Sequence, residues 1–194
     1  CHMRILARFA PAYTLGMTIA ALILADPESL TKGSPSPALT RLIEAAWSGG
    51  AHPILIAGLS VEHNFAPLAQ TTEASGQKAA GAEALRLVGG TSALLTLPIA
   101  HAGVDPETIT ALIAAHGREA NVVLRAAFNG SAGPIQLTPL SLLEQTDNEP
   151  AALIECGDEA AVRPSDGRTR LSYEAPPADT NAVDPWERRG GEED

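Results

Sequence analysis

Short runs of apolar residues alternate along the chain with longer segments in which apolar residues recur every three or four positions. The run from Ile19 to Ala25 is continuously apolar and stops at Asp26. A run of this length, bounded by a turn signal, is typical of a strand that is buried on both faces of a sheet. The pattern therefore predicts a parallel sheet whose first strand leads into a polar loop from Asp26 to Gly33.

Further strands and helices continue this alternation. Predicted helices start at Pro37, Ser75-Gly76-Gln77-Lys78, Asp105-Pro106-Glu107 (with Asp105 as the cap) and Thr138-Pro139, and glycine pairs end the first two. Predicted strands lie at 53–58, 92–98, 121–127 and 168–174, with a helical turn from Val61 to Ala66 and a turn from Gly130 to Gly133. This order predicts an α/β fold, a three-layer α/β/α sandwich with a mostly parallel sheet and right-handed connections.

The composition fits a single domain. The 194 residues are enough for one hydrophobic core, and 45% of them are apolar although only 4% are aromatic. The core must therefore consist mainly of Ala, Leu, Ile and Val. We predict one domain over 17–185, preceded by an N-terminal extension over 1–16 and followed by an acidic tail over 186–194.

Charge and cysteine content indicate which partners and which cell compartment to expect. The formal charge is -10 and no basic stripe occurs, which argues against nucleic acid as a partner. Two cysteines, one of them Cys1, give no disulfide framework and fit a reducing compartment, so we predict a cytoplasmic protein. The apolar stretch from Ala10 to Ala25 is too short to span a membrane, so no membrane is expected.

The first residues allow two interpretations. Residues 1–3 have the character of a cloning remnant, which puts the native start at Met3 or at Met17. Arg4 and Arg8 before an apolar stretch also fit a secretory signal peptide. We favour the first interpretation because the apolar stretch continues into the α/β alternation.

Five stretches of the chain have the character of known motifs. They are the loop Leu24–Gly33 (LADPESLTKG), the helix start Ser75–Lys78 (SGQK), the segment Leu97–Thr108 (LPIAHAGVDPET), the turn Gly133-Pro134 and the closing segment Asp179–Arg188 (DTNAVDPWER). Together they resemble the molybdenum-cofactor nucleotidyltransferases, which are the molybdopterin guanylyl- and cytidylyltransferases. The resemblance covers nearly the whole chain and implies the nucleotide-diphospho-sugar-transferase architecture, which is GT-A-like and Rossmann-like.

This resemblance also implies a chemistry and a set of residues. The family transfers a nucleotide from GTP or CTP to a pterin phosphate, with Mg²⁺, and releases pyrophosphate. Backbone amides and cations must hold the triphosphate, and carboxylates must hold the metal ion. By position in the motifs, the nucleotide-binding residues would be Leu24, Ala25, Asp26, Ser29, Lys32, Gly76 and Gln77, and the metal ligands would be Asp179 and Asn181.

The chain departs from the family at positions that this chemistry needs. In the phosphate loop, Pro27 stands where the family has glycine and has no amide hydrogen to donate, and Glu28 adds a negative charge. Thr31 stands where the family has arginine, and the part of the loop after Gly33 that carries a second lysine is missing. At the end of the third strand, Ala100 stands where the family has its metal-binding aspartate.

Several of these side chains also have plain structural interpretations. Asp26, Ser29 and Lys32 fit a solvated loop with helix-capping chemistry as well as a remodelled ligand loop. For His101, a hydrogen-bonded position at a strand end is favoured over a metal ligand, because Mg²⁺ prefers oxygen. His116 is predicted on the buried face of its helix, where its role would be structural.

Three functions follow from the sequence. The first is a divergent family member that has lost or weakened nucleotidyl transfer and acts by binding GTP, CTP or a molybdoenzyme-maturation partner. The second is an active Mg²⁺-dependent nucleotidyltransferase with a remodelled phosphate loop, in which Asp26 or Asp179 would hold the metal ion. The third is an acidic scaffold that docks through its C-terminal region. Sugar-nucleotide and phospholactate substrates also remain open, because relatives with this architecture use them.

Overall fold

The computed structural model describes residues 18–26, 29–31, 34–59, 64–65, 69–74, 76–143 and 152–164. Several sequence predictions lie outside this part: the extension over 1–16, Lys32, the strand at 168–174, the ligands Asp179 and Asn181, and the tail over 186–194. In the part that is described, no helix is long and apolar enough to cross a membrane.

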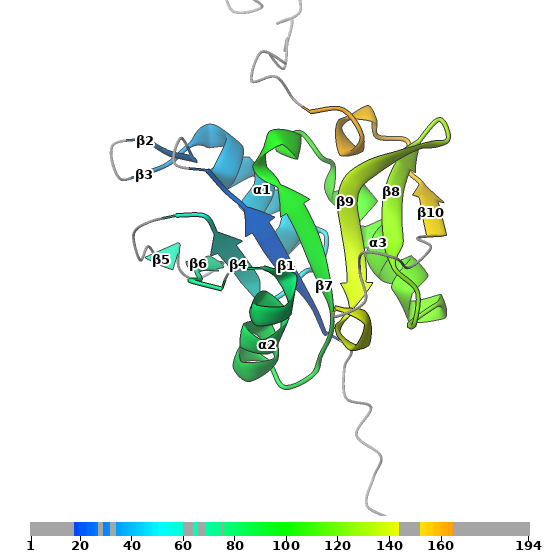
Figure 1. The fold of residues 1–194 in the computed structure, drawn as a ribbon. Coiled ribbons are helices and arrows are strands. Elements are labelled where there is room, and N and C mark those ends of the chain that lie inside the picture. The colour runs from blue at the N-terminus through cyan, green and yellow to red at the C-terminus, as the bar shows by residue number, and fades with distance from the viewer. Residues whose placement is uncertain are drawn as a thin grey trace, which may run out of the picture.

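The described strands form an eight-stranded sheet and a separate two-stranded hairpin (Figure 1). The sheet strands are β1 (Thr18–Leu24), β4 (Ile54–Ala57), β5 (Asn64–Phe65), β6 (Ala69–Thr71), β7 (Thr91–Pro98), β8 (Leu124–Phe128), β9 (Ser131–Pro139) and β10 (Ala152–Glu155), and the hairpin strands are β2 (Leu30–Thr31) and β3 (Ser34–Pro35). The order in the sheet is β10-β8-β9-β7-β1-β4-β6-β5. Four of its seven neighbouring pairs are parallel, whereas β9 and β5 run antiparallel to their neighbours.

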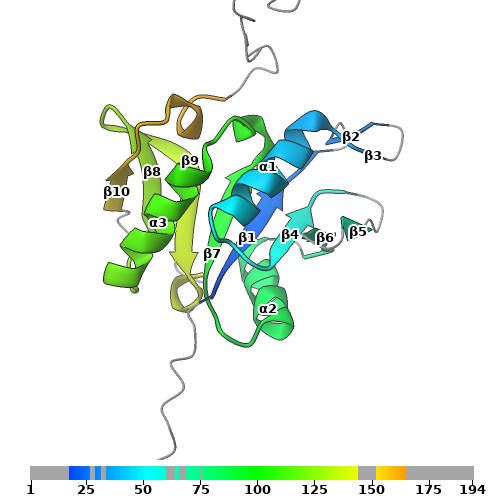
Figure 2. The same ribbon diagram turned by 180° about the vertical axis from the view of Figure 1, so that it is seen from behind.

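Helices cover both faces of this sheet. α1 (Pro37–Ser48) and α3 (Pro106–Arg118) pack on one face, and α2 (Gln77–Leu87) packs on the other (Figures 1 and 2). α1 starts as its sequence predicts, because the Ser36 hydroxyl accepts a hydrogen bond from the Leu39 amide and Pro37 occupies the first turn. The predicted three-layer α/β/α sandwich with a mostly parallel sheet is confirmed.

β1 is the central strand of the core. Its residues from Ile19 to Ile23 are at most 3% exposed, because β1 lies between β4 and β7 with a helical layer over each face. Ala21 packs with α1 and α3, and Leu22 packs with α2. Burial on both faces explains why the sequence of this strand is continuously apolar.

The segment from residue 129 to 142 differs from the prediction. The turn lies at Asn129 and Gly130, which have φ values of 51° and 76°, and residues 131–139 form the strand β9 instead of a turn and a helix start. The register of β8 against β9 shifts between Arg125 and Ala127, where residues 133–135 of β9 lie opposite the single residue 126 of β8, so Gly133 and Pro134 are part of a bulge in β9. A proline, which cannot donate a ladder hydrogen bond, is tolerated at such a bulge. After Pro139 the described chain makes only a short 3-10 turn, η3 (Leu140–Leu142).

Two element boundaries also differ. The strand predicted from Asn121 begins at Leu124. Residues 64–65, which lie within the predicted helical turn from Val61 to Ala66, form the short strand β5, and the other residues of that turn lie outside the described part. Both differences concern segments that lack a strong apolar period.

His116 lies on the buried face of α3, as its sequence position predicts. It is 1% exposed, its Nε2 lies 3.4 Å from the Ser92 hydroxyl, and its Nδ1 has no hydrogen-bond partner. Burial lowers the pKa of His116 below its ordinary value of 6.5, because the charged imidazolium would lose its hydration.

This buried imidazole should make stability depend on pH. Because the folded-state pKa lies below the unfolded-state value, the unfolded chain binds a proton first when the pH falls below 6.5. The free energy of unfolding should therefore fall as the pH drops from there toward the folded-state pKa, and His116→Gln should remove this part of the decline. Urea unfolding from about pH 8 to about pH 5 measures it. His52→Gln, at an exposed histidine, should keep the decline, and equal pH profiles for the unaltered protein and His116→Gln would contradict this account.

Candidate functional site

The loop after β1 lies at the carboxyl edge of the sheet, where ligands bind in folds of this class. Leu24, the last residue of β1, is 41% exposed. The amide of Ala25 donates a hydrogen bond of 2.9 Å to the carbonyl of Ala57 at the end of β4. The first two nucleotide-binding residues that the sequence predicts therefore sit at the expected edge, and one of their amides is already used within the fold.

Asp26 and Ser29, two further predicted residues, bind each other. The Asp26 amide donates to Ser29 Oγ at 3.1 Å, and the Ser29 hydroxyl donates to Asp26 Oδ1 at 2.8 Å. The Ser29 amide also donates to the Asp26 carbonyl at 3.0 Å, and the Ser29 side chain is only 2% exposed. We call this arrangement the Asp26–Ser29 turn. Its internal hydrogen bonds occupy polar groups that could otherwise bind a phosphate at the end of β1.

Gly58 brings the ends of β1 and β4 together. It follows β4 with a φ of 94°, and a Cβ at this position would overlap the carbonyl oxygen of Ala25. Only glycine adopts this conformation without strain and also leaves room for that carbonyl. The position of the loop after β1 therefore depends on a glycine, which acts only through its backbone conformation and its small size.

Gly76 and Gln77 form the start of α2 at the same edge. Gly76 occupies the N-cap with a φ of 100°, and the Gln77 side-chain amide donates to the Thr96 hydroxyl of β7 at 3.2 Å. Thr96 lies beside Leu22 in the sheet register, two residues before the end of β1. The structure thus places these two predicted residues near the loop after β1, although no hydrogen bond among the described residues joins the two segments.

The described residues do not fit a divalent cation. Among them, no group of three or more His, Cys, Asp or Glu side chains is arranged to share a metal ion. Ala100, which has no ligand atom in its side chain, lies in the 3-10 turn η2 (Ile99–His101) directly after β7. His101 is 5% exposed and its Nδ1–H donates to the Ala160 carbonyl at 2.9 Å, which agrees with the hydrogen-bonded position expected for it.

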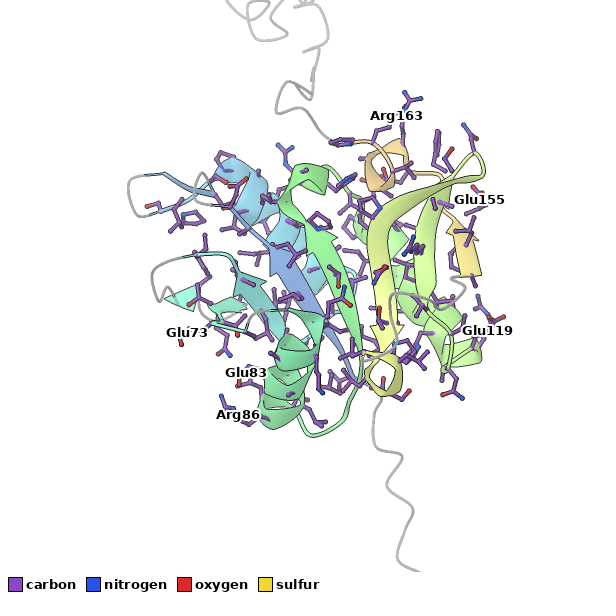
Figure 3. The ribbon with its side chains drawn as sticks, in the orientation of Figure 1. Glu73, Glu83, Arg86, Glu119, Glu155 and Arg163 are labelled. Carbon is purple, nitrogen blue, oxygen red and sulfur yellow. The ribbon has the colours of Figure 1, made fainter. Side chains whose placement is uncertain are left out.

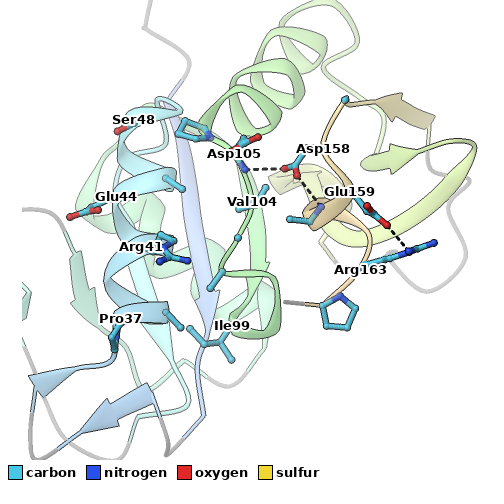
Figure 4. Close-up of a pocket in the computed structure, with 18 residues that line it drawn as sticks. Pro37, Arg41, Glu44, Ser48, Ile99, Val104, Asp105, Asp158, Glu159 and Arg163 are labelled. Atoms are coloured by element: carbon cyan, nitrogen blue, oxygen red, sulfur yellow. Dashed lines mark hydrogen bonds and ion pairs between the residues drawn. The ribbon is translucent and has the colours of Figure 1, made fainter. Parts of the chain in front are cut away.

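A groove of about 960 Å³ lies near this edge on the side of α1 and α3 (Figure 4). Its walls are α1, the segment 99–106 before and at the start of α3, and the segment 157–164 after β10. Arg41 of α1 lines one wall, and Asp158 and Glu159 line the opposite wall. None of the predicted nucleotide-binding residues in the described part lines this groove, so it is separate from the loop after β1.

The N-terminal cap of α3 lies in one wall of the groove, and it differs from the sequence prediction. Asp105 occupies the N-cap, but its side chain accepts no capping hydrogen bond. Instead, the Asp158 carboxylate accepts hydrogen bonds from the Asp105 amide at 2.9 Å, the Thr108 hydroxyl at 3.0 Å and the Ala160 amide at 2.9 Å. Burial, together with the negative charges of Asp158 and Glu107, raises the pKa of Asp105 above its ordinary range. Asp158 therefore joins the start of α3 to the turn η4 (Glu159–Ala161).

We expect Gly58→Ala to destabilise the protein by roughly 2–3 kcal/mol, because the new methyl group meets the Ala25 carbonyl and the backbone keeps a positive φ. Denaturation in guanidinium chloride measures this change. Gly89→Ala is the matched control, because a Cβ there would meet no atom within 4 Å. A loss for Gly58→Ala no larger than that for the control would show that the approach of the two strand ends does not matter.

Comparisons with known proteins establish the fold of this chain. No protein-family model matches the sequence, and a comparison with curated proteins gives no match. Among solved structures, the chain is similar to Rv0371c from Mycobacterium tuberculosis H37Rv in complex with manganese. The identity is 10% and the TM-score is 0.55, over 72% of this chain and 88% of that chain.

Two further solved structures have names that state a nucleotide chemistry. One is the 2-C-methyl-D-erythritol 4-phosphate cytidylyltransferase from Thermus thermophilus, with 18% identity and a TM-score of 0.51 over 76% of this chain and 92% of that chain. The other is a CMP:2-keto-3-deoxy-manno-octonic acid synthetase complexed with CTP, with 10% identity and a TM-score of 0.51 over 72% of this chain and 90% of that chain. At these identities the likeness shows that the chain shares the fold of these structures, and it shows nothing beyond the fold.

Proposed function

We propose that this chain is a divergent protein of the nucleotidyltransferase fold that has lost or weakened nucleotidyl transfer and acts by binding. The observation that carries this proposal is the Asp26–Ser29 turn. In the resembling family, the corresponding loop holds the triphosphate with backbone amides. In this chain the amides of Ala25 and Asp26 already have partners, and the loop presents a carboxylate to any phosphate that approaches.

The lack of a metal-ligand cluster among the described residues supports the same proposal. The described residues offer no cluster of metal ligands, and Ala100 stands where the family has its aspartate. Ligands for Mg²⁺ would then have to come from Asp26, whose Oδ1 already accepts a hydrogen bond from Ser29, and from Asp179 and Asn181, which lie outside the described part. One carboxylate that is already hydrogen-bonded, one further carboxylate and one amide are a weak set for a cation that needs near-octahedral oxygen ligands.

The biological setting that we propose is the assembly of the molybdenum cofactor in the cytoplasm. It is supported by the five sequence stretches that resemble those transferases and by the cysteine content. In this setting the protein would bind GTP or CTP weakly, or would bind a molybdoenzyme-maturation partner. The similarity of the fold to a synthetase complexed with CTP supports a nucleotide as the ligand class.

We expect calorimetric titration with CTP or GTP, each with Mg²⁺, to show no binding in the micromolar range and no pyrophosphate release. A charge-assisted hydrogen bond contributes about 1.5–3 kcal/mol, so the loss of two such donors weakens nucleotide binding by on the order of 10²–10⁴-fold. Micromolar binding with pyrophosphate release would contradict the proposal. It would instead favour an active Mg²⁺-dependent nucleotidyltransferase with a remodelled phosphate loop.

A double variant sharpens this test. Asp26→Ala with Pro27→Gly removes the carboxylate that holds Ser29 and adds a backbone amide at position 27. Nucleotide binding should then tighten by about tenfold or more. Glu119→Ala removes the same charge at the far end of α3 and should leave nucleotide binding unchanged.

A further inference from the structure

The groove between α1 and the segment 157–164 has room for a small organic ligand. Its volume is about 960 Å³, and ligand sites in proteins commonly enclose about 300–1,000 Å³. The α1 residues that line it recur at helical spacing from Pro37 to Ser48. The groove therefore follows one face of the whole helix, over roughly 16 Å along the helix axis.

The floor of the groove consists of small apolar residues. Ala45 of α1 lines it, together with Ala102 and Val104 of the segment 99–106, and each of the three is at most 5% exposed. Side chains this short leave the volume above them open, and they offer an apolar surface to the middle of a ligand.

Arg41 places a positive charge without a partner on the α1 wall. It is exposed, and its side chain forms no ion pair or hydrogen bond with the described residues. Arg163 on the opposite wall differs, because it is already paired with Glu159 (Figure 4). Glu44 lies one turn after Arg41, but its carboxylate points away from that opposite wall (Figure 4). Arg41 can therefore bind an anionic group that enters the groove.

Asp105 places a negative charge without a partner toward the other end of the groove. Its carboxylate accepts no hydrogen bond from the described residues. Burial, together with the negative charges of Asp158 and Glu107, raises the pKa of Asp105 above its ordinary range. A cation beside Asp105 would stabilise its charged form, so this end of the groove favours a positively charged group.

The two unpaired charges lie on the order of 10 Å apart along the groove. Asp105 precedes α3, whose first residue, Pro106, has its carbonyl 3.0 Å from where a Cβ on Gly49 would be. Asp105 is therefore level with the C-terminal end of α1, and Arg41 lies eight residues before Gly49, which is about 12 Å of helix. The two termini of an extended tripeptide are separated by roughly 10 Å.

We propose that the groove binds a zwitterionic small molecule of about the length of a tripeptide, with its carboxylate at Arg41 and its ammonium group at Asp105. Such a molecule satisfies both charges at once, whereas a dianion would meet the Asp105 carboxylate and a diamine would meet the guanidinium of Arg41. The site uses neither residue of the Asp26–Ser29 turn. It therefore stands or fails independently of nucleotide binding at the loop after β1.

The test is a ¹H–¹⁵N NMR titration of the full-length protein with tri-alanine at constant ionic strength. Tri-alanine has both charged termini, and its capped form, N-acetyl-tri-alanine amide, has neither. We expect saturable shifts of the Ala45, Ala102 and Gly103 amide resonances with tri-alanine, and binding of the capped form that is weaker by about threefold or more. Equal affinities of the two forms, or no saturable shift of these resonances at millimolar tri-alanine, would overturn the proposal.

Two variants assign the ends of the ligand. Arg41→Gln and Asp105→Asn remove charges that have no partner among the described residues, so both variants should fold, and each should weaken tri-alanine binding by about threefold. N-acetyl-tri-alanine keeps only the carboxylate and should respond to Arg41→Gln alone. Tri-alanine amide keeps only the ammonium group and should respond to Asp105→Asn alone. The reverse pattern, or unchanged affinity in both variants, would contradict the assignment.

Matched controls remove the same charges outside the groove. Arg118→Gln and Glu119→Gln lie at the end of α3 that is away from the groove, and Figure 3 shows Glu119 far from Arg163. Both control variants should bind tri-alanine with unchanged affinity. A loss in the controls as large as in Arg41→Gln and Asp105→Asn would show that only the overall charge matters, and it would overturn the proposed site.

Discussion

The burial of β1 on both faces is the constraint on which the rest of the structure depends. A strand enclosed by two neighbouring strands and two helical layers can carry only apolar side chains, and its register against β4 and β7 then fixes where their carboxyl ends meet. The loop after β1, the start of α2 and the turn after β7 follow from that register. Gly58 completes the arrangement, because it allows the ends of β1 and β4 to approach.

At this edge the chain combines a common scaffold with unusual loop chemistry. The fold is shared with nucleotidyltransferases, but the Asp26–Ser29 turn satisfies its own polar groups and leaves a negative charge facing outward. An anion-binding loop needs free amides and cations. In this chain the Asp26 amide is bonded to Ser29, and the Asp26 side chain adds a negative charge. Among the described residues, the buried polar side-chain atoms without a partner are His116 Nδ1 and Arg125 Nε, and neither lies in this loop. The proposed binding role rests on this contrast between the shared fold and the chemistry of the loop.

Much of the fold could be predicted from the sequence because its signals are local. The apolar run of β1, the Ser36-Pro37 start of α1 and the buried period of α3 each lie within one segment. The prediction for β9 is wrong because Gly133 and Pro134 are local turn signals. Only the pairing of β9 with β8 and β7 places these two residues in a bulge within a strand. The hydrogen bonds of Asp158 to α3 depend on residues that are distant in sequence, so no local pattern could reveal them.

The measurement that tests the central claim most directly is the exchange of the Asp26 amide hydrogen, followed by NMR with and without CTP and Mg²⁺. If the Asp26–Ser29 turn is closed as described, this amide is already bonded to Ser29 Oγ. Its resonance and its exchange rate should then stay unchanged when CTP is added. A large shift of the Asp26 resonance together with slower exchange, saturating at micromolar CTP, would show that the loop opens to hold a triphosphate and would contradict the account.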